Sequence, residues 1–344
     1  MEIAQVKTVG KAALRAVKQG MYYTNITPMP FRILADLTDR CNFRCPTCSK
    51  WRVKPGEEMT TSDWKEVLAK LKNKSLTGRI SFAGGEATLR PDLCELIKYA
   101  KESRLNVTVV TNGFLLTEKL LREFERAGLN GLVVSLNGVN RATHDESRGV
   151  SGSFDRIMNI LPIMSKFRYE VNLETIIMET NLEQLILLVK LSKQYDLYGI
   201  HFQALGDVGA HYALINHKMP DAAHDWYKEA RFWIRNPAKA SQVLNQLIRM
   251  QKDGYRILNP SHQLKRMIQY YSAPETIKEM KCMGGVSSLY IDPYGEVRVC
   301  YGFEPIGNIR ESEPLTLWRS NGAREIRRKV KHCDKMCRLL NNNY

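Results

Sequence analysis

The stretch DRCNFRCPTCSKW, residues 39–51, places three cysteines at the spacing C-x₃-C-x₂-C. It follows FRILADL, residues 31–37, which has the composition of a buried strand, so the cysteines are expected on the loop after that strand. A structural zinc site and an ordinary iron–sulfur cluster each take four ligands. Cys41, Cys45 and Cys48 therefore leave one ligand position to explain.

Two interpretations of the loop remain open at this point. A zinc ion would need a fourth ligand from elsewhere in the chain, such as His144 or His201. A [4Fe–4S] cluster on the three thiolates would instead keep one iron without a protein ligand. On a reduced cluster, that open iron is a place where a small chelating molecule could bind and receive an electron.

The composition indicates a globular protein of a reducing compartment. The chain has 344 residues, 39.5 kDa and 44% hydrophobic residues, which suits one large domain, or one domain with an appendage, and excludes a disordered or fibrous protein. No apolar run has the length of a signal-peptide core or a membrane-spanning helix, so we expect a cytoplasmic location. Thiols stay reduced there, so metal binding explains the eight cysteines better than disulfides do.

The formal net charge is +15, which favours an anionic partner such as a phosphorylated metabolite, a charged cofactor, a membrane surface or nucleic acid. The longest basic cluster, residues 324–335, lies in the cysteine-containing tail, and no nucleic-acid-binding module is recognisable, so no nucleic acid is expected. Residues 6–21, VKTVGKAALRAVKQGM, are basic and amphipathic. They favour either a helix docked on the protein or a helix lying on a membrane surface.

Up to about residue 205, short β-branched runs alternate with amphipathic stretches, which is the pattern of βα units on a parallel sheet. Residues 60–73, TTSDWKEVLAKLKN, open with helix-capping residues, and residues 117–128, TEKLLREFERAG, close with Gly128. Six such units are too few for a closed eight-stranded barrel, so the sequence predicts an α/β fold with a partial (β/α)₆ TIM-like barrel open on one side. The expected strands are Arg32–Leu37, Arg79–Phe82, Val107–Thr111, Gly131–Leu136, Glu170–Ile177 and Gly199–Leu205.

The pattern changes after Leu205. Residues 222–276 are expected to be mainly helical, and the aromatic and aliphatic residues at helical intervals there are expected in the core. Beyond them, the strands Leu289–Asp292 and Glu296–Cys300 flank the turn signal PYG and predict a hairpin. The core residues expected are Trp226, Phe232, Trp233, Leu247 and Met250. We divide the chain into a basic amphipathic segment (1–30), the barrel (31–215), a mainly helical connection (216–280) and a small hairpin-plus-helix domain that binds a cluster (281–344).

The other cysteines fall into two groups. Cys94 lies in PDLCELIKYA among apolar residues and is expected to be a buried small hydrophobe. The remaining four form two pairs, Cys282 with Cys300 across the hairpin and Cys333 with Cys337 on the basic tail. Four thiols are a complete ligand set for a second iron–sulfur cluster, with a zinc knuckle as the alternative.

The cysteine loop after a first strand, followed by GGE at residues 84–86, resembles the radical S-adenosylmethionine (SAM) enzymes. The resemblance implies that Cys41, Cys45 and Cys48 hold a catalytic [4Fe–4S] cluster and that SAM chelates its open iron. It further implies that one-electron reduction cleaves SAM to methionine and a 5′-deoxyadenosyl radical, which abstracts a hydrogen atom from the substrate. Thr47 stands where the family often has an aromatic residue, which leaves the adenine contacts open.

The resemblance also implies cofactor contacts at the strand ends. Glu86 would accept a hydrogen bond from the methionine ammonium, and the two glycines before it would let the backbone approach closely. The sequence TNG, residues 111–113, ends the third strand in the same way. The cofactor-binding residues implied are Gly84, Gly85, Glu86, Thr111, Asn112, Ser135 and Arg148.

Two of these residues have structural alternatives. Ser135 could cap a turn, and Arg148 could pair with Asp145 or Glu146. Asn137 stands where the family often has Asp, so an acid/base role at this position is open.

Residues 282–300, CMGGVSSLYIDPYGEVRVC, with the later IGNI and LW, look like the shared start of the SPASM and twitch domains, which bind auxiliary clusters. Four cysteines match the shorter twitch type, which has one such cluster. The closing pair is C-x₃-C instead of the usual C-x₂-C, so a ligand exchange with His332 or an iron open to the substrate stays possible. The resemblance covers roughly residues 31–206 and 281–337.

These features predict an enzyme that cleaves SAM and abstracts hydrogen from an anionic small molecule, with a net oxidation such as dehydrogenation as the leading expectation. The alternatives are radical modification of a peptide or of a lipid or lipid-linked sugar and, from another class, a non-catalytic electron-transfer protein. The complete cysteine loop and Glu86 argue against the last. The expected cofactors are two [4Fe–4S] clusters and SAM. The expected partners are the substrate, an electron donor such as flavodoxin or ferredoxin, and a possible peripheral membrane contact.

Overall fold

The structure is a computed structural model that describes residues 30, 32–72, 78–206, 226–280, 282–333, 337, 340 and 341. The basic amphipathic segment predicted near the N-terminus lies outside the described residues. No helix within these ranges is long and apolar enough to cross a membrane.

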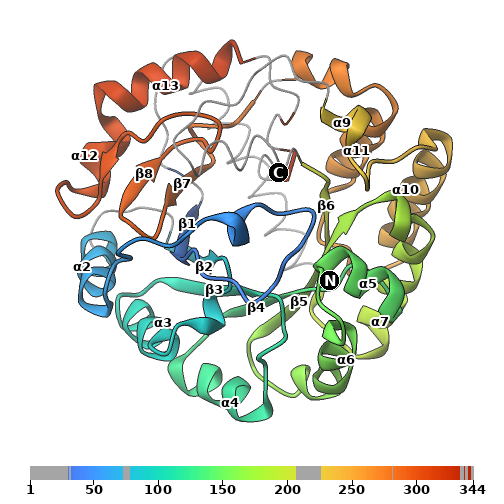
Figure 1. The fold of residues 1–344 in the computed structure, drawn as a ribbon, viewed down its shortest axis with the longest axis horizontal. Coiled ribbons are helices and arrows are strands. Elements are labelled where there is room, and N and C mark those ends of the chain that lie inside the picture. Colours follow the sequence, from blue (N-terminus) through green and yellow to red (C-terminus); the bar gives the residue numbers. More distant parts are fainter. Residues whose placement is uncertain are drawn as a thin grey trace.

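Six parallel strands form the wall of an open barrel and follow one another in space in chain order (Figure 1). Every neighbouring pair among them is parallel. The predicted partial barrel is confirmed, and no strand boundary differs from its expected position by more than two residues. The strands are β1 (Arg32–Thr38), β2 (Arg79–Gly84), β3 (Asn106–Thr111), β4 (Gly131–Ser135), β5 (Glu170–Ile177) and β6 (Gly199–Ala204).

The helices that connect these strands lie on the outside of the barrel (Figure 1). Helix α4 begins as its sequence predicts, because the Thr117 hydroxyl accepts a hydrogen bond from the Leu120 N–H, and it ends at Gly128, whose φ of 85° favours glycine. The helices are α2 (Thr61–Lys72), α3 (Leu93–Glu102), α4 (Glu118–Ala127), α5 (Arg141–Arg148), α6 (Ser153–Met164) and α7 (Leu185–Gln194). Three 3₁₀ turns are η1 (Lys50–Arg52), η2 (Ala87–Leu89) and η3 (Glu179–Gln184).

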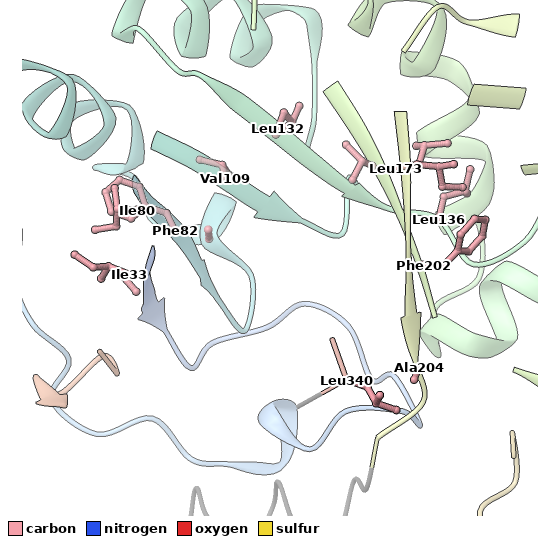
Figure 2. Close-up of a cluster of buried hydrophobic side chains, with 14 of the residues drawn as sticks. Ile33, Ile80, Phe82, Val109, Leu132, Leu136, Leu173, Phe202, Ala204 and Leu340 are labelled. Carbon is pink, nitrogen blue, oxygen red and sulfur yellow. The ribbon is translucent and has the colours of Figure 1, made fainter. Parts of the chain in front are cut away.

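The main hydrophobic core lies between the strands and this ring of helices. In β5, burial alternates residue by residue from Val171 to Ile177, as the period of a strand requires. Figure 2 shows side chains such as Phe82, Leu132 and Phe202 on the buried face of their strands. The half-buried residues of the other face line the barrel interior.

The open edge of the barrel, strand β6, is covered by backbone and by two asparagine side chains. Ile200 pairs with the chain around Ile257. Asn259 then accepts from the Phe202 N–H at 2.7 Å and donates to the Phe202 carbonyl at 2.8 Å. Asn341 binds Ala204 in the same way: its side chain accepts from the Ala204 N–H at 2.7 Å and donates to the Ala204 carbonyl at 2.9 Å. These amide groups satisfy backbone positions that would otherwise be an exposed strand edge.

The connection after β6 is helical, as predicted, in the part that the structure describes. It contains α9 (Trp226–Glu229), α10 (Pro237–Lys252), α11 (Ser261–Ser272) and the turn η4 (Pro274–Glu279). Four of the five residues expected in its core are buried, namely Phe232, Trp233, Leu247 and Met250. The fifth, Trp226, is partly buried against them.

The C-terminal hairpin does not stand apart from the barrel. Strand β7 (Ser288–Ile291) pairs in parallel with β1, and β8 (Glu296–Arg298) and β9 (Gly307–Asn308) extend the same sheet in antiparallel fashion. The sequence predicted the hairpin and its turn at Gly295, but it gave no sign of the pairing with β1. Helices α12 (Pro314–Arg319) and α13 (Asn321–Lys331) complete the segment.

Candidate active site

The three cysteines of the first loop converge at the carboxyl end of β1. Burial, with smaller contributions from the nearby Cys45, Glu86 and Cys48, raises the pKa of the Cys41 thiol to about 11. The Phe43 N–H, which donates to the Cys41 sulfur at 3.4 Å, acts in the opposite direction. The thiols and Glu86 therefore face one common space.

Neither histidine that was considered for zinc joins these cysteines. His144 Nδ1 accepts from the Asn137 N–H at 3.1 Å, and His201 Nδ1 lies 3.5 Å from a carboxylate oxygen of Glu174. Among the described residues, no three His, Cys, Asp or Glu side chains are arranged to hold a single metal ion. A [4Fe–4S] cluster is larger than one ion and keeps its thiolates farther apart, so the three converging thiols suit a cluster better than zinc.

A buried ion network, which no local sequence pattern indicated, holds the end of the cysteine loop in place. The Lys50 ammonium donates to Asp36 at 2.6 Å and to Asp39 at 2.9 Å. Burial disfavours its charge, but the two carboxylates outweigh burial and hold the pKa of Lys50 above its usual value. Lys50 follows Cys48 by two residues, so this network holds the third cysteine against β1.

The GGE segment packs against the start of the cysteine loop. A Cβ on Gly84 would lie 2.3 Å from the Thr38 carbonyl, and one on Gly85 would lie 2.2 Å from the Arg40 carbonyl. The Gly85 and Glu86 N–H groups donate to those same two carbonyls. The glycines are therefore required for contact between the two loops, and their approach to the cofactor stays a prediction.

Glu86 is almost fully buried, and its carboxylate accepts four hydrogen bonds. Thr88 donates twice, Thr111 donates its hydroxyl at 2.7 Å, and the Asn112 N–H donates at 2.7 Å. The Asn112 side chain also donates to Asn42 in the cysteine loop at 2.8 Å. Thr111 and Asn112 therefore hold Glu86 and the cysteine loop in place.

Arg148, the last residue of α5, lies beside the second cysteine. Burial raises the pKa of Cys45, and the Arg148 guanidinium is the largest influence that lowers it. Its Cζ lies 5.5 Å from the Phe43 ring centroid, and its buried Nε has no hydrogen-bond partner among the described residues. The alternative pairing with acidic neighbours is wrong, because Asp145 binds the Gly152–Phe154 turn and Glu146 pairs with Arg231.

Asn137 has a structural role that explains why an amide stands there. Its Nδ2 donates to the Ser147 hydroxyl at 3.1 Å, and Ser147 in turn donates to the His144 carbonyl at 2.8 Å. Its Oδ1 accepts from the Ile176 N–H at 3.0 Å. A carboxylate could not supply the first of these bonds, and the buried amide has no acid/base capacity.

The interior wall of the barrel carries several polar residues, of which the sequence analysis had named Ser135 for the cofactor and His201 for zinc, but not Glu174 or Asn172. Ser135, Glu174 and His201 lie level with one another across β4, β5 and β6. Glu174 and His201 are each about one-fifth exposed, with side-chain exposures of 22% and 23%. The Oδ1 of Asn172, on the same face of β5, is buried without a hydrogen-bond partner in the described chain. In the sequence, the only signal that these side chains share the inner face was their position at every second residue of the predicted strands.

The four C-terminal cysteines form a second site. Burial raises the pKa of Cys300 well above its usual value, and Cys282, Cys337 and Cys333 add to the effect because they lie nearby. The Gly284 N–H donates to the Cys282 sulfur at 3.3 Å, and the Gly302 N–H donates to the Cys300 sulfur at 3.4 Å, as at Cys41. Such bonds tune the potential of thiolate-ligated clusters.

Cys94 lies outside both sites. It is half-buried against the core of the barrel, so the prediction of a buried small hydrophobe overstated its burial.

Comparison with protein-family models identifies the fold and its chemistry. Residues 36–228, more than half of the chain, match the radical SAM superfamily. The chain belongs to the radical SAM superfamily. Residues 282–339 match the SPASM iron–sulfur cluster-binding domain. This radical SAM enzyme therefore has SAM and a [4Fe–4S] cluster as cofactors in its barrel, and its SPASM domain adds cluster binding.

Relatives of this radical SAM protein have several activities by name. The AdoMet-dependent heme synthase of Methanosarcina barkeri is 27% identical over 327 residues, which cover 90% of this chain and 87% of the relative. The PqqA peptide cyclase of Bradyrhizobium diazoefficiens is 26% identical over 284 residues, which cover 81% of this chain and 68% of the relative.

Solved structures share the fold. SuiB of Streptococcus suis bound to S-adenosylmethionine has a TM-score of 0.69 at 15% identity and covers 94% of this chain and 73% of its own. The structure of anSMEcpe with bound AdoMet has a TM-score of 0.62 at 17% identity, with coverages of 88% and 83%.

Proposed function

We propose that this radical SAM enzyme modifies a peptide. The observation that carries the proposal is that three of its sequence relatives are PqqA peptide cyclases by name, at 23–26% identity. The leading expectation from the sequence was an anionic small-molecule substrate. We propose the peptide alternative in its place.

The polar wall of the barrel interior supports the choice. Glu174 and Asn172 present oxygen acceptors to the interior, and His201 lies beside Glu174. Acceptors suit a substrate that brings N–H or O–H donors, as a peptide backbone does. A carboxylate at this level would repel an anionic group on the substrate.

The proposed ligand sets follow the two groups of converging thiols. Cys41, Cys45 and Cys48 hold the first cluster, and Cys282, Cys300, Cys333 and Cys337 hold the second. When bound, the first cluster and SAM supply one-electron cleavage of the sulfonium and a radical that abstracts hydrogen.

In the proposed site, the chain's own groups orient the cofactor. Glu86, held by Thr111 and Asn112, accepts from the methionine ammonium. Arg148, whose Nε has no protein partner among the described residues, donates to the carboxylate, and Ser135 contacts a polar group of SAM. Asn137 and His144 hold α5 so that Arg148 points toward the cysteine loop.

The test uses short peptides encoded next to the gene, each co-expressed with the enzyme and examined by mass spectrometry. The expected result is the loss of a hydrogen pair from one peptide, which requires intact Cys41, Cys45 and Cys48. If no peptide is changed while the purified enzyme still forms 5′-deoxyadenosine with dithionite, the peptide proposal fails and the radical class stands.

A second candidate function is oxidation of an anionic small molecule. It is favoured by the match to the heme synthase, which covers 90% of this chain, and by the net charge of +15. Under this function the second cluster accepts an electron from the substrate. Replacement of its four cysteines would then abolish the oxidised product and leave SAM cleavage measurable.

Two further expectations stay proposals. We propose a cytoplasmic location, because free thiols and thiolate-bound clusters need a reducing compartment. We also propose an acidic electron carrier as reductant. The possible membrane contact depends on residues outside the described ranges.

A further inference from the structure

The loop that carries the first three cysteines is unusually basic. From residue 40 to residue 56 the sequence has five basic residues and no acidic one. Lys50 is buried with two carboxylates, but Arg40, Arg44, Arg52 and Lys54 are exposed. We call these four residues, together with Trp51 between them, the basic loop surface.

The exposed basic side chains of this surface have few carboxylate partners among the described residues. In the described parts of the chain, Arg44, Arg52 and Lys54 take part in no ion pair, and Arg40 reaches only Glu58, at 3.5 Å. Many exposed basic residues on the outer helices have carboxylate partners instead. Examples are Arg141 with Asp155, Lys239 with Glu183 and Lys329 with Glu304. Like charges on one loop repel one another, and without nearby carboxylates they leave a positive surface that suits an external anionic partner.

Trp51 connects this surface directly to the proposed cluster ligands. Its indole N–H donates to the Cys45 carbonyl at 3.0 Å. The guanidinium carbons of Arg44 and Arg52 lie 5.6 and 5.1 Å from its ring centroid, within the range of cation–π contacts. Arg44 also donates to the Cys41 carbonyl at 3.1 Å. A partner that contacts Trp51 is therefore one hydrogen bond from the backbone of a cluster ligand.

We propose that the basic loop surface docks an acidic one-electron carrier protein and that Trp51 lies at the centre of the contact. The loop crosses the open end of the barrel between β1 and α2 (Figure 1). The carrier gives one electron to the cluster; a flavodoxin does so by going from flavin hydroquinone to semiquinone. The proposal rests on the radical SAM class and is independent of the substrate.

The test compares two reductants on the reconstituted enzyme. In the double variant Arg52→Gln and Lys54→Gln, reduction of the first cluster by flavodoxin hydroquinone should slow about three- to tenfold at low ionic strength, because complementary charge steers association. Cluster bleaching is followed by absorbance, so the readout does not require turnover. Reduction by dithionite, which needs no docking, should keep the wild-type rate. The difference should shrink as salt screens the charges.

The matched control is Lys119→Gln with Arg126→Gln, which removes two exposed charges from the outer helix α4. This control should reduce at the wild-type rate with both reductants. The proposal is overturned if the loop variant slows equally with dithionite, if it does not slow with flavodoxin, or if the control slows as much.

Discussion

Glu86 is more constrained than a surface carboxylate, because four donors already face it. In Glu86→Gln the new amide N–H₂ must face one of these donors or the cofactor ammonium. A charge-assisted hydrogen bond contributes about 1.5–3 kcal/mol, so SAM affinity should fall about ten- to a hundredfold. Equilibrium binding to the reconstituted enzyme measures this, with Glu57→Gln in the exposed part of the loop as control. Equal affinity in both variants would leave Glu86 only a structural role.

His144 predicts a pH dependence of stability. It is fully buried, and burial, with Arg148 second, lowers its pKa from 6.5 to about 3. The folded state therefore holds the neutral ring, and the stability this contributes is complete above the unfolded pKa of 6.5 and is lost as pH falls toward 3. Below pH 6.5 the free energy of unfolding should fall by an amount that approaches about 1.4 kcal/mol per pH unit.

Urea unfolding of the cluster-free protein at pH 7.5 and pH 5.5 checks this. His144→Gln removes the titrating ring, so its stability should change less between the two pH values than that of the wild type. If both proteins lost the same free energy of unfolding between these pH values, groups other than His144 would cause the sensitivity to acid.

At the scale of elements, the edge of β6 depends on Asn259. In Asn259→Ala the N–H and carbonyl of buried Phe202 lose their partners. Each buried unsatisfied group costs about 1–3 kcal/mol, so the loss of both partners should lower the free energy of unfolding by about 2–6 kcal/mol in total. Asn245→Ala, on the exposed side of α10, should change it by less than about 0.5 kcal/mol. A similar small change at Asn259 would mean that water replaces the amide.

The elements show what the sequence could predict. Strand periodicity placed all six barrel strands, and Thr117 and Gly128 marked the ends of α4, because these signals are local. The pairing of β7 with β1 joins residues 288 and 32, so no local pattern could reveal it.

The candidate site likewise has some features that the sequence could predict and others that it could not. Cysteine spacing marked both thiol groups, since ligands must be close in space and partly in sequence. The partners of Glu86 and the network of Lys50 with Asp36 and Asp39 depend on how separate loops meet. Glu174 was missed, and His201 was considered only as a zinc ligand, because a polar residue at an inward-facing strand position looks the same in the sequence as one facing solvent.

In the whole molecule, the two thiol sites are joined by buried side chains. The Tyr290 and Tyr301 ring centroids are 3.9 Å apart, and both residues adjoin the second site, since Tyr301 follows Cys300. Burial raises the pKa of Tyr301, and Asp36, the partner of Lys50, adds to this because it lies nearby. Tyr290 and Tyr301 therefore lie between the second thiol site and the first loop, with Cys282 and Cys300 near Tyr290 and Asp36 near Tyr301.

The C-terminal segment also covers both edges of the barrel sheet. Strand β7 pairs with β1 at one edge, and at the other edge Asn341 binds Ala204 while the buried Leu340 lies beside it (Figure 2). A chain that ends at residue 280 would lose the β7 pairing along β1 and the Asn341 cover at Ala204, which exposes strand edge and apolar surface there, although Ile257 and Asn259 would still cover the rest of β6. We therefore expect this truncated chain to aggregate on expression.

The matched comparison is the full-length chain with Cys282, Cys300, Cys333 and Cys337 replaced by Ala, which keeps β7, Leu340 and Asn341. This variant should keep the oligomeric state of the wild type and bind about half of its iron, if each thiol group holds one cluster of equal size. It should still cleave SAM, because the first cluster and Glu86 are untouched. Size-exclusion chromatography, iron analysis and thermal unfolding distinguish the two proteins. A truncated chain that is monomeric and unfolds at the wild-type temperature would show that the SPASM domain is an appendage, contrary to the shared sheet. Aggregation of the truncated chain alone would show that the barrel needs the segment for its fold and not only for a second cluster.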